Sequence, residues 1–183
     1  IRDYKVTGVQ TCALPILQKV NTSGVEIERK FLLKAFPEEL PLLEKSALYQ
    51  GYLCTDPVVR IRSREEKGQK SFVLCFKGQG TLMRREIEMD LTETQFSQLS
   101  ELLKAPLIRK DFRVYQLPDG HRLECSLVDE GSPSAFLYAE VEFSSLEDAR
   151  SFQPPEFLYR DVTEFPGFSM SRYWETRQRP FID

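Results

Sequence analysis

Pairs of glutamates separated by one residue recur along the chain. They are Glu26 and Glu28, Glu86 and Glu88, and Glu140 and Glu142. In an extended strand, residues two apart point to the same face, so each pair brings two carboxylates together. Like charges placed this way repel one another unless an opposite charge lies between them. Since Mg²⁺ and Mn²⁺ prefer carboxylate oxygen, these pairs predict a site for a hard divalent cation.

Basic residues show the same spacing. Arg60, Arg62 and Arg64 alternate with apolar or small residues, and Lys30 and Arg84 share a strand face with glutamates. Guanidinium groups can bind phosphate oxygens through two parallel hydrogen bonds. These residues predict a polyanion site beside the cation site. The alternative is a sheet with one solvated face, but the density of same-sign charge argues against it.

Alternating apolar residues and turn residues predict the strands that carry these charges. Eight are expected, at 25–33, 48–55, 58–65, 71–77, 82–91, 108–117, 121–128 and 135–143, with a short irregular or strand-like segment at 161–163. Helices are expected at 35–46, 92–104, about 144–152 and 169–177. Thr92 and Gln95 have the spacing of a capping box. Tyr173 and Trp174 of the last helix could pack on the strands or on a partner, and packing on the strands is favoured.

Short connections between neighbouring strands predict antiparallel pairing. Eight strands can close around side chains and one small ligand. The predicted fold class is therefore mainly β (α+β), a closed eight-stranded antiparallel β-barrel with peripheral helices. The charged faces are expected inside, and the apolar faces outside beneath the helices.

The composition narrows the possible partners and compartments. A net charge of −3 and the absence of a long apolar run give no indication of a nucleic-acid or membrane partner. Cys12, Cys54, Cys75 and Cys125 form no CxxC pair, and His121 is the single histidine. Cys75 and Cys125 are expected to be buried small residues rather than ligands. A reducing, cytoplasmic setting is expected, and the oligomeric state is left open.

The first sixteen residues differ in pattern from the rest of the chain. Segment 1–16, IRDYKVTGVQTCALPI, has no helical or strand period and resembles a translated sequencing adaptor. We interpret it as non-native and exclude it from fold reasoning, as one would a tag. Residues 17–24 are expected to be a linker, and 25–183 a single domain.

The motif Glu26-x-Glu28-x-Lys30 resembles the ExExK signature of the CYTH superfamily, the triphosphate tunnel metalloenzymes. The resemblance covers roughly residues 25–174. Further blocks follow in the family's order: QGYL at 50–53, VRIR at 59–62, FKG at 76–78, RREIE at 84–88, YAEVEF at 138–143 and DVT at 161–163.

The resemblance implies roles for individual residues. Divalent-metal ligands would be Glu26, Glu28, Glu140 and Glu142, with Glu86 and Glu88 assisting the metal or orienting the basic groups. Phosphate-binding residues would be Lys30, Arg60, Arg62, Lys77 and Arg84. The family often has Lys-x-Arg on its sixth strand, whereas Lys110 and Arg113 are three apart here and would face opposite ways without a bulge. Lys110 is favoured as the inward residue, and Arg113 is a further candidate. Glu124 takes the place of an acidic residue on the seventh strand.

The resemblance also implies an activity. The expected reaction is metal-dependent hydrolysis of a linear triphosphate, such as inorganic tripolyphosphate, in the barrel with Mg²⁺ or Mn²⁺. Glu28, Lys30 and Lys77 are the candidate catalytic residues. The alternatives on the same site are a class IV-type adenylate cyclase and a thiamine triphosphatase. An alternative of another class is a non-catalytic polyphosphate- or nucleotide-binding module.

Overall fold

The computed structural model describes residues 24–165, 167–178 and 180. The predicted adaptor segment 1–16 and the predicted linker up to residue 23 lie outside these residues. None of the helices in the described part of the chain is long and apolar enough to cross a membrane.

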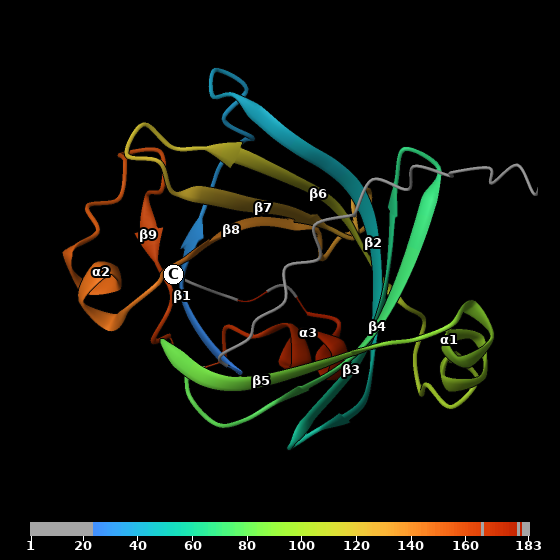
Figure 1. The fold of residues 1–183 in the computed structure, drawn as a ribbon. Helices are drawn as coiled ribbons and strands as arrows, with labels where there is room; N and C mark the ends of the chain where they lie inside the picture. Colours follow the sequence, from blue (N-terminus) through green and yellow to red (C-terminus); the bar gives the residue numbers. More distant parts are fainter. Residues whose placement is uncertain (1–23, 166, 179, 181–183) are drawn as a thin grey trace, which may run out of the picture.

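The described residues form a β-barrel with three short helices (Figure 1). The strands are β1 (Val25–Leu32), β2 (Leu42–Thr55), β3 (Val58–Glu66), β4 (Gln69–Lys77), β5 (Met83–Asp90), β6 (Ile108–Gln116), β7 (Arg122–Val128), β8 (Phe136–Glu142) and β9 (Arg160–Asp161). The helices are α1 (Glu93–Ser100), α2 (Leu146–Ser151) and α3 (Met170–Thr176). The predicted fold class is confirmed.

Strand β1 closes the barrel. The other strands follow the order β5-β4-β3-β2-β6-β7-β8, and every neighbouring pair is antiparallel. β1 pairs with β8 on one edge, and its first residues pair with β5 on the other. The last residues of β1 pair instead with the short strand β9. The strand that carries Glu26, Glu28 and Lys30 is therefore held on both edges.

The helix predicted at 35–46 is wrong. Residues 35–41 form turns and irregular chain, and β2 already begins at Leu42. Pro41 lies within the predicted helix, where it removes a backbone donor and disfavours helical geometry in the residue before it. β2 gains hydrogen-bonded partners on both edges, in β3 and β6. The leucine-rich stripe thus belongs to a strand of fourteen residues.

The predicted helix start at Thr92 is confirmed. The Thr92 side chain accepts a hydrogen bond from the backbone of Gln95, and the Gln95 side chain accepts one from the backbone of Thr92. Ser145 and Ser169 cap α2 and α3 in a similar way, each accepting a hydrogen bond from a backbone amide three residues on. These caps satisfy amide groups that have no partner inside the helix.

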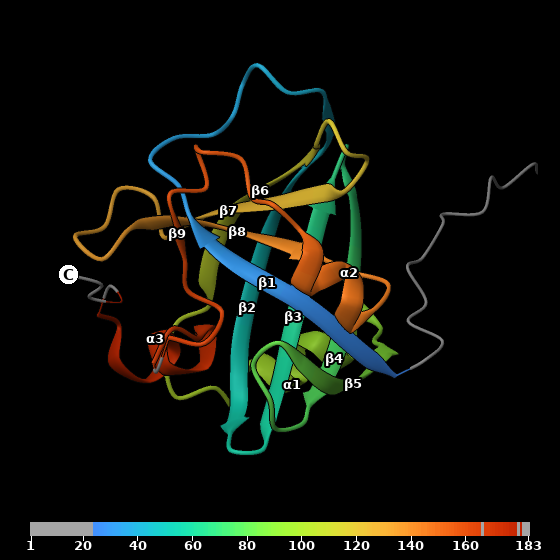
Figure 2. The same cartoon turned by 90° about the vertical axis from the view of Figure 1, so that its left-hand side faces the viewer.

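Two apolar clusters hold the barrel and its helices together. The first lies outside the barrel, where Phe31, Leu123 and Val141 pack with Ala149 of α2 and Phe152; Figure 2 shows α2 lying over β1. In the second, Tyr173 and Trp174 of α3 pack against the inward-facing residues Tyr52, Ile108, Val128, Phe136 and Tyr138. In Figure 1, α3 lies within the outline of the ring of strands. Helix α3 therefore covers one end of the barrel, and the packing expected of Tyr173 and Trp174 is confirmed.

Candidate active site

The strand registers place most of the predicted site residues on the inner face of the barrel. Residues opposite each other in neighbouring strands share a face. Glu28 lies opposite Glu142, Lys30 opposite Glu140, and Glu140 opposite Glu124. The inward-facing predicted residues are Glu26, Glu28, Lys30, Arg60, Arg62, Lys77, Arg84, Glu86, Glu88, Lys110, Glu124, Glu140 and Glu142.

The carboxylates of β1 are bound by cations from three strands. Arg84 of β5 donates from Nε to Glu26 Oε2 at 2.7 Å and from Nη2 to Glu28 Oε1 at 2.6 Å. Lys77 Nζ lies 3.0 Å from both carboxylate oxygens of Glu26. Lys30 forms an ion pair with Glu28 and lies 3.7 Å from Glu140. Acidic and basic groups therefore alternate across the interior.

A second group of ion pairs joins β3, β4 and β5. Arg60 and Arg62 lie 3.4 Å and 3.3 Å from Glu88. Glu86 lies 3.0 Å from Lys77 and 3.8 Å from Arg60. Lys77 is thus shared between the two groups.

Several of these side chains have shifted pKa values. Burial and the neighbouring Glu140 raise the pKa of Glu28 above its ordinary value, although Lys30 works in the opposite direction. Burial would raise the pKa of Glu26, but Lys77 and Arg84 outweigh it and hold the pKa well below its ordinary value. Burial opposes ionisation of Glu140 as well, and Lys30, Lys110 and Lys77 together lower its pKa. Burial lowers the pKa of Lys110 to about 7, although Glu140 works in the opposite direction. Glu26 and Glu140 therefore stay ionised at neutral pH, as metal ligands must.

Arg113 does not reach the interior, and its predicted phosphate-binding role is corrected. Its guanidinium donates to Asp111 at 2.9 Å and to Glu38 at 2.7 Å, and it lies over the Phe36 ring at 3.8 Å. The β6–β7 pairing runs without a register shift, from Lys110 opposite Val128 onward. With regular alternation, a spacing of three places Lys110 inside and Arg113 outside.

Cys75 is an inward-facing residue whose role was not predicted. It is buried, as expected, but its Sγ lies 3.0 Å from Glu86 Oε1. Single ligand atoms of Cys75, Glu86 and Glu88 all lie within 4.8 Å of one another, a spacing that could hold a metal ion. The sequence could have indicated this position, because Cys75 lies two residues before Lys77 in the same strand and the two side chains must share a face.

Two tyrosines also face inward without having been predicted as site residues. Lys110 Nζ donates to Tyr138 Oη at 2.7 Å, and Gln50 Nε2 donates to Tyr52 Oη at 3.0 Å. Tyr138 lies two residues before Glu140, so the same alternation could have identified it. These residues mark where the charged interior meets the cluster covered by α3.

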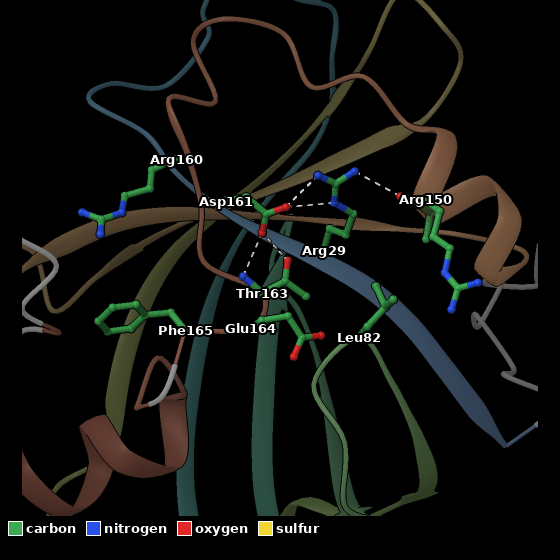
Figure 3. A pocket seen from close by; sticks show the side chains of 9 residues that line it. Arg29, Leu82, Arg150, Arg160, Asp161, Thr163, Glu164 and Phe165 are labelled. Carbon is green, nitrogen blue, oxygen red and sulfur yellow. Dashed lines mark hydrogen bonds and ion pairs between the residues drawn. The ribbon is translucent and has the colours of Figure 1, made fainter.

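A separate pocket of about 490 Å³ lies on the outer side of β1. Figure 3 shows Arg29, Asp161 and Thr163 among the residues that line it. Thr163 Oγ1 accepts a hydrogen bond from the backbone amide of Lys30 at 2.9 Å. Arg29 donates to Asp161 Oδ2 at 2.6 Å. These contacts fix β1 from outside and so help to position Lys30 inside.

The chain resembles known proteins in sequence and in fold. No family model matches the chain. Over 139 residues it is 36% identical to the inorganic triphosphatase of Nitrosomonas europaea, covering 76% of this chain and 89% of that protein. A crystal structure of an inorganic triphosphatase matches with a TM-score of 0.55 and 31% identity, covering 80% of this chain and 92% of that one.

A more distant structure shows the fold alone. It is a putative adenylyl cyclase from Hippeastrum, described as having a dominant triphosphatase activity. It matches with a TM-score of 0.54 and 16% identity over 84% of this chain and 96% of that one. The identity to the Nitrosomonas europaea protein is high over most of both chains. On that evidence, the chain belongs to the family of this inorganic triphosphatase.

Proposed function

We propose that this protein is a divalent-metal-dependent triphosphatase of the CYTH superfamily that hydrolyses linear triphosphates inside its barrel. The observation that carries the proposal is the inward-facing set of carboxylates, of which Glu26, Glu28, Glu86, Glu88 and Glu140 each lie within 4 Å of a lysine or arginine that could bind phosphate instead. The 36% identity to an inorganic triphosphatase supports tripolyphosphate as the first substrate to test. The free thiols of Cys54, Cys75 and Cys125 support a reducing, cytoplasmic setting.

The phosphates would be bound by the inward-facing cations. Arg60 and Arg62 approach along β3, while Lys77 and Arg84 reach the same space from β4 and β5. The remaining two, Lys30 and Lys110, lie near Glu140. Held in a largely buried site, these groups need little reorganisation as charge develops on the phosphoryl oxygens. Lys30 and Lys77 are the proposed catalytic cations.

The donor set fits a hard divalent cation, because the interior offers carboxylate oxygens, and neighbouring cations lower the pKa values of Glu26 and Glu140. We propose Glu26, Glu28, Glu140 and Glu142 as ligands of Mg²⁺ or Mn²⁺, with Glu86, Glu88 and Glu124 assisting. When bound, such an ion neutralises charge on the phosphate oxygens as the P–O bond breaks. Triphosphate would compete for Arg84 and Lys77, and Glu26 and Glu28 could then hold the ion.

Glu28 is the proposed base. It would accept a proton from the water that attacks the terminal phosphorus, and the bond to the bridging oxygen would break to release phosphate and pyrophosphate. Glu28 is buried and touches Lys30 and Arg84, which would orient its carboxylate.

The test is turnover of tripolyphosphate, ATP and thiamine triphosphate with Mg²⁺ or Mn²⁺, measuring release of phosphate and cyclic AMP. We expect phosphate release from tripolyphosphate and its loss in EDTA. Glu28→Gln should lower kcat by about a hundredfold or more, the usual effect of losing one electrostatic catalytic group. The control is Glu38→Gln, on the outer surface, which should retain activity. Cyclic AMP formation would favour the cyclase, and tight binding without turnover would favour a binding module.

A further inference from the structure

Four charged side chains form a cluster at the end of the barrel opposite α3. Arg64 Nη2 lies 2.6 Å from Glu44 Oε2 and 3.3 Å from Glu66 Oε2, and Arg122 donates to the other oxygen of Glu44. Glu44 belongs to β2, Arg64 and Glu66 to β3, and Arg122 to β7. We call these four residues the mouth cluster. The proposed function assigns them no role.

The mouth cluster extends the row of phosphate-binding arginines on β3. Arg60, Arg62 and Arg64 share the inner face, and Arg64 lies about 7 Å beyond Arg62 along the strand. The Arg60 side chain is 10% exposed, whereas that of Arg64 is 32% exposed. A phosphate chain bound along this row would therefore reach Arg64 last, at the open end.

Arg64 packs against an apolar cluster inside the barrel. Its guanidinium lies over the Phe112 ring at 5.4 Å, and Phe112 packs with Leu48 and Val114 in a small apolar cluster inside the barrel. A guanidinium is costly to bury in this apolar cluster, which favours a position of the Arg64 charge at the mouth. The charge of Arg64 therefore lies at the mouth, where Arg64 already forms an ion pair with Glu44.

The charges of the cluster balance. Two arginines face two glutamates, and the exposed Lys67 lies 3.9 Å from Glu66 at the edge of the cluster. A fourth phosphate arriving at the mouth must therefore displace a carboxylate to reach either arginine. Burial would raise the pKa of Glu44, but hydrogen bonds from Arg122 and Arg64 hold it below its ordinary value. Glu44 therefore remains ionised throughout the neutral range.

We propose that Glu44 limits the substrate to three phosphates, by neutralising Arg64 and Arg122 and repelling any phosphate beyond the third. The inference rests on the proposed triphosphatase function and makes Glu44 a specificity-determining residue. Removing its charge would leave these four residues with a net charge of +1. Arg122 would lose its partner Glu44, and Arg64 would keep only Glu66 at 3.3 Å, so both could bind a longer linear polyphosphate.

The experiment compares kcat/KM for tetrapolyphosphate and tripolyphosphate. Glu44→Gln should raise the ratio of tetrapolyphosphate to tripolyphosphate turnover by about tenfold, the size of one charge-assisted hydrogen bond. Adding Arg64→Gln to that variant should reverse the gain. The matched control is Glu38→Gln, which breaks the 2.7 Å ion pair with Arg113 outside the barrel and should leave the ratio unchanged.

An unchanged ratio in Glu44→Gln, or an equal rise in Glu38→Gln, would overturn the inference. Its failure can be distinguished from failure of the proposed function. If the wild-type protein does not hydrolyse tripolyphosphate, the proposed function fails. In that case, calorimetry measures the affinities of the wild type and of Glu44→Gln for tetrapolyphosphate and tripolyphosphate. The variant should show the higher ratio of tetrapolyphosphate to tripolyphosphate affinity. Thermal unfolding of each variant checks that the substitutions leave the barrel folded.

Discussion

Arg84 is the shared hydrogen-bond donor to the two carboxylates of β1. It donates to Glu26 and Glu28, two of the proposed metal ligands, with bonds of 2.7 Å and 2.6 Å. A buried carboxylate without a cation is costly, so Arg84 stabilises the protein before any ligand binds. The same guanidinium is a proposed phosphate ligand. Binding of triphosphate would thus exchange the partner of Arg84 and prepare the metal site.

The first prediction concerns Arg84→Gln. Without triphosphate, Mn²⁺ should bind about tenfold more tightly, or about 1.4 kcal/mol, because a competing positive charge is gone. The KM for tripolyphosphate should rise, since a phosphate ligand is lost. Titration calorimetry measures the first effect and steady-state kinetics the second. Arg113→Gln, on the outer face, is the control, and equal Mn²⁺ affinity in both variants would contradict the argument.

At the scale of elements, the stability of helix α3 depends on its contacts with the barrel. A seven-residue helix has little stability of its own. Its Trp174 ring lies 5.9 Å from that of Tyr52, and Tyr173 Oη donates to Asp129 Oδ2 at 2.7 Å. Arg177 pairs with Asp129 at 3.4 Å and lies over the Trp174 ring at 4.6 Å. Packing and polar contacts together hold the helix across the barrel end.

Trp174→Ala should therefore lower the free energy of unfolding by about 3 kcal/mol, the usual cost of removing a large buried aromatic side chain. Urea denaturation measures the change. The comparison is Leu102→Ala, at a side chain that is 68% exposed, where a change within about 0.5 kcal/mol is expected. Similar losses at both positions would show that α3 does not seal the barrel end as described.

His121 joins the β6–β7 turn to α2. Its Nδ1 lies 3.0 Å from Asp119 and its Nε2 3.3 Å from Asp148, and its ring contacts Phe143 and Phe152. Burial would lower the pKa of His121, but hydrogen bonds with Asp119 and Asp148 outweigh it and raise the pKa. A raised folded-state pKa means that protonated His121 stabilises the fold. That contribution is complete below the ordinary histidine pKa of about 6.5 and is lost as pH rises through the folded value.

His121→Gln should accordingly remove a pH-dependent part of stability. Between pH 5.5 and pH 8, the Tm of the wild-type protein should fall relative to that of the variant. Calorimetric melts across this range measure the difference. A constant difference between the two proteins at every pH would exclude a titrating contact at His121.

At the scale of the whole molecule, closure of the barrel begins at Val25. This residue lies opposite Arg85 of β5, and the next residues of β1 complete the pairing. The segment interpreted as adaptor sequence ends nine residues earlier, at residue 16. The strand pairings and ion pairs described above involve residues after Gly24.

Because we interpret residues 1–16 as adaptor sequence, deleting them should change neither Tm nor kcat/KM for tripolyphosphate. Thermal melts and kinetics of the shortened chain test this. A clear loss of either would show that the segment contributes to the protein. Resequencing the locus is an independent check of the adaptor interpretation.

The sequence by itself determined which side chains face inward. Alternation along a strand is a local property, so Glu26, Glu28 and Lys30 could be assigned to one face without knowledge of their neighbours. The same rule separated Lys110 from Arg113, which the uninterrupted β6–β7 register then placed on opposite faces. The helix predicted at 35–46 failed because a short leucine-rich stripe fits both a helix and a strand, and the pairing of β2 with β3 and β6 selected the strand.

Only the tertiary structure decided which inward-facing groups meet. Arg84 binds Glu26 and Glu28 because β5 closes onto β1, and Cys75 approaches Glu86 because of the β4–β5 register. Glu44 and Arg122 were not predicted as site residues, and they meet Arg64 because strands β2, β3 and β7 bring the three side chains together. The physical reason is that alternation depends on neighbouring peptide units alone. Register and closure depend on hydrogen bonds between segments far apart in the chain, and no local pattern encodes those distances.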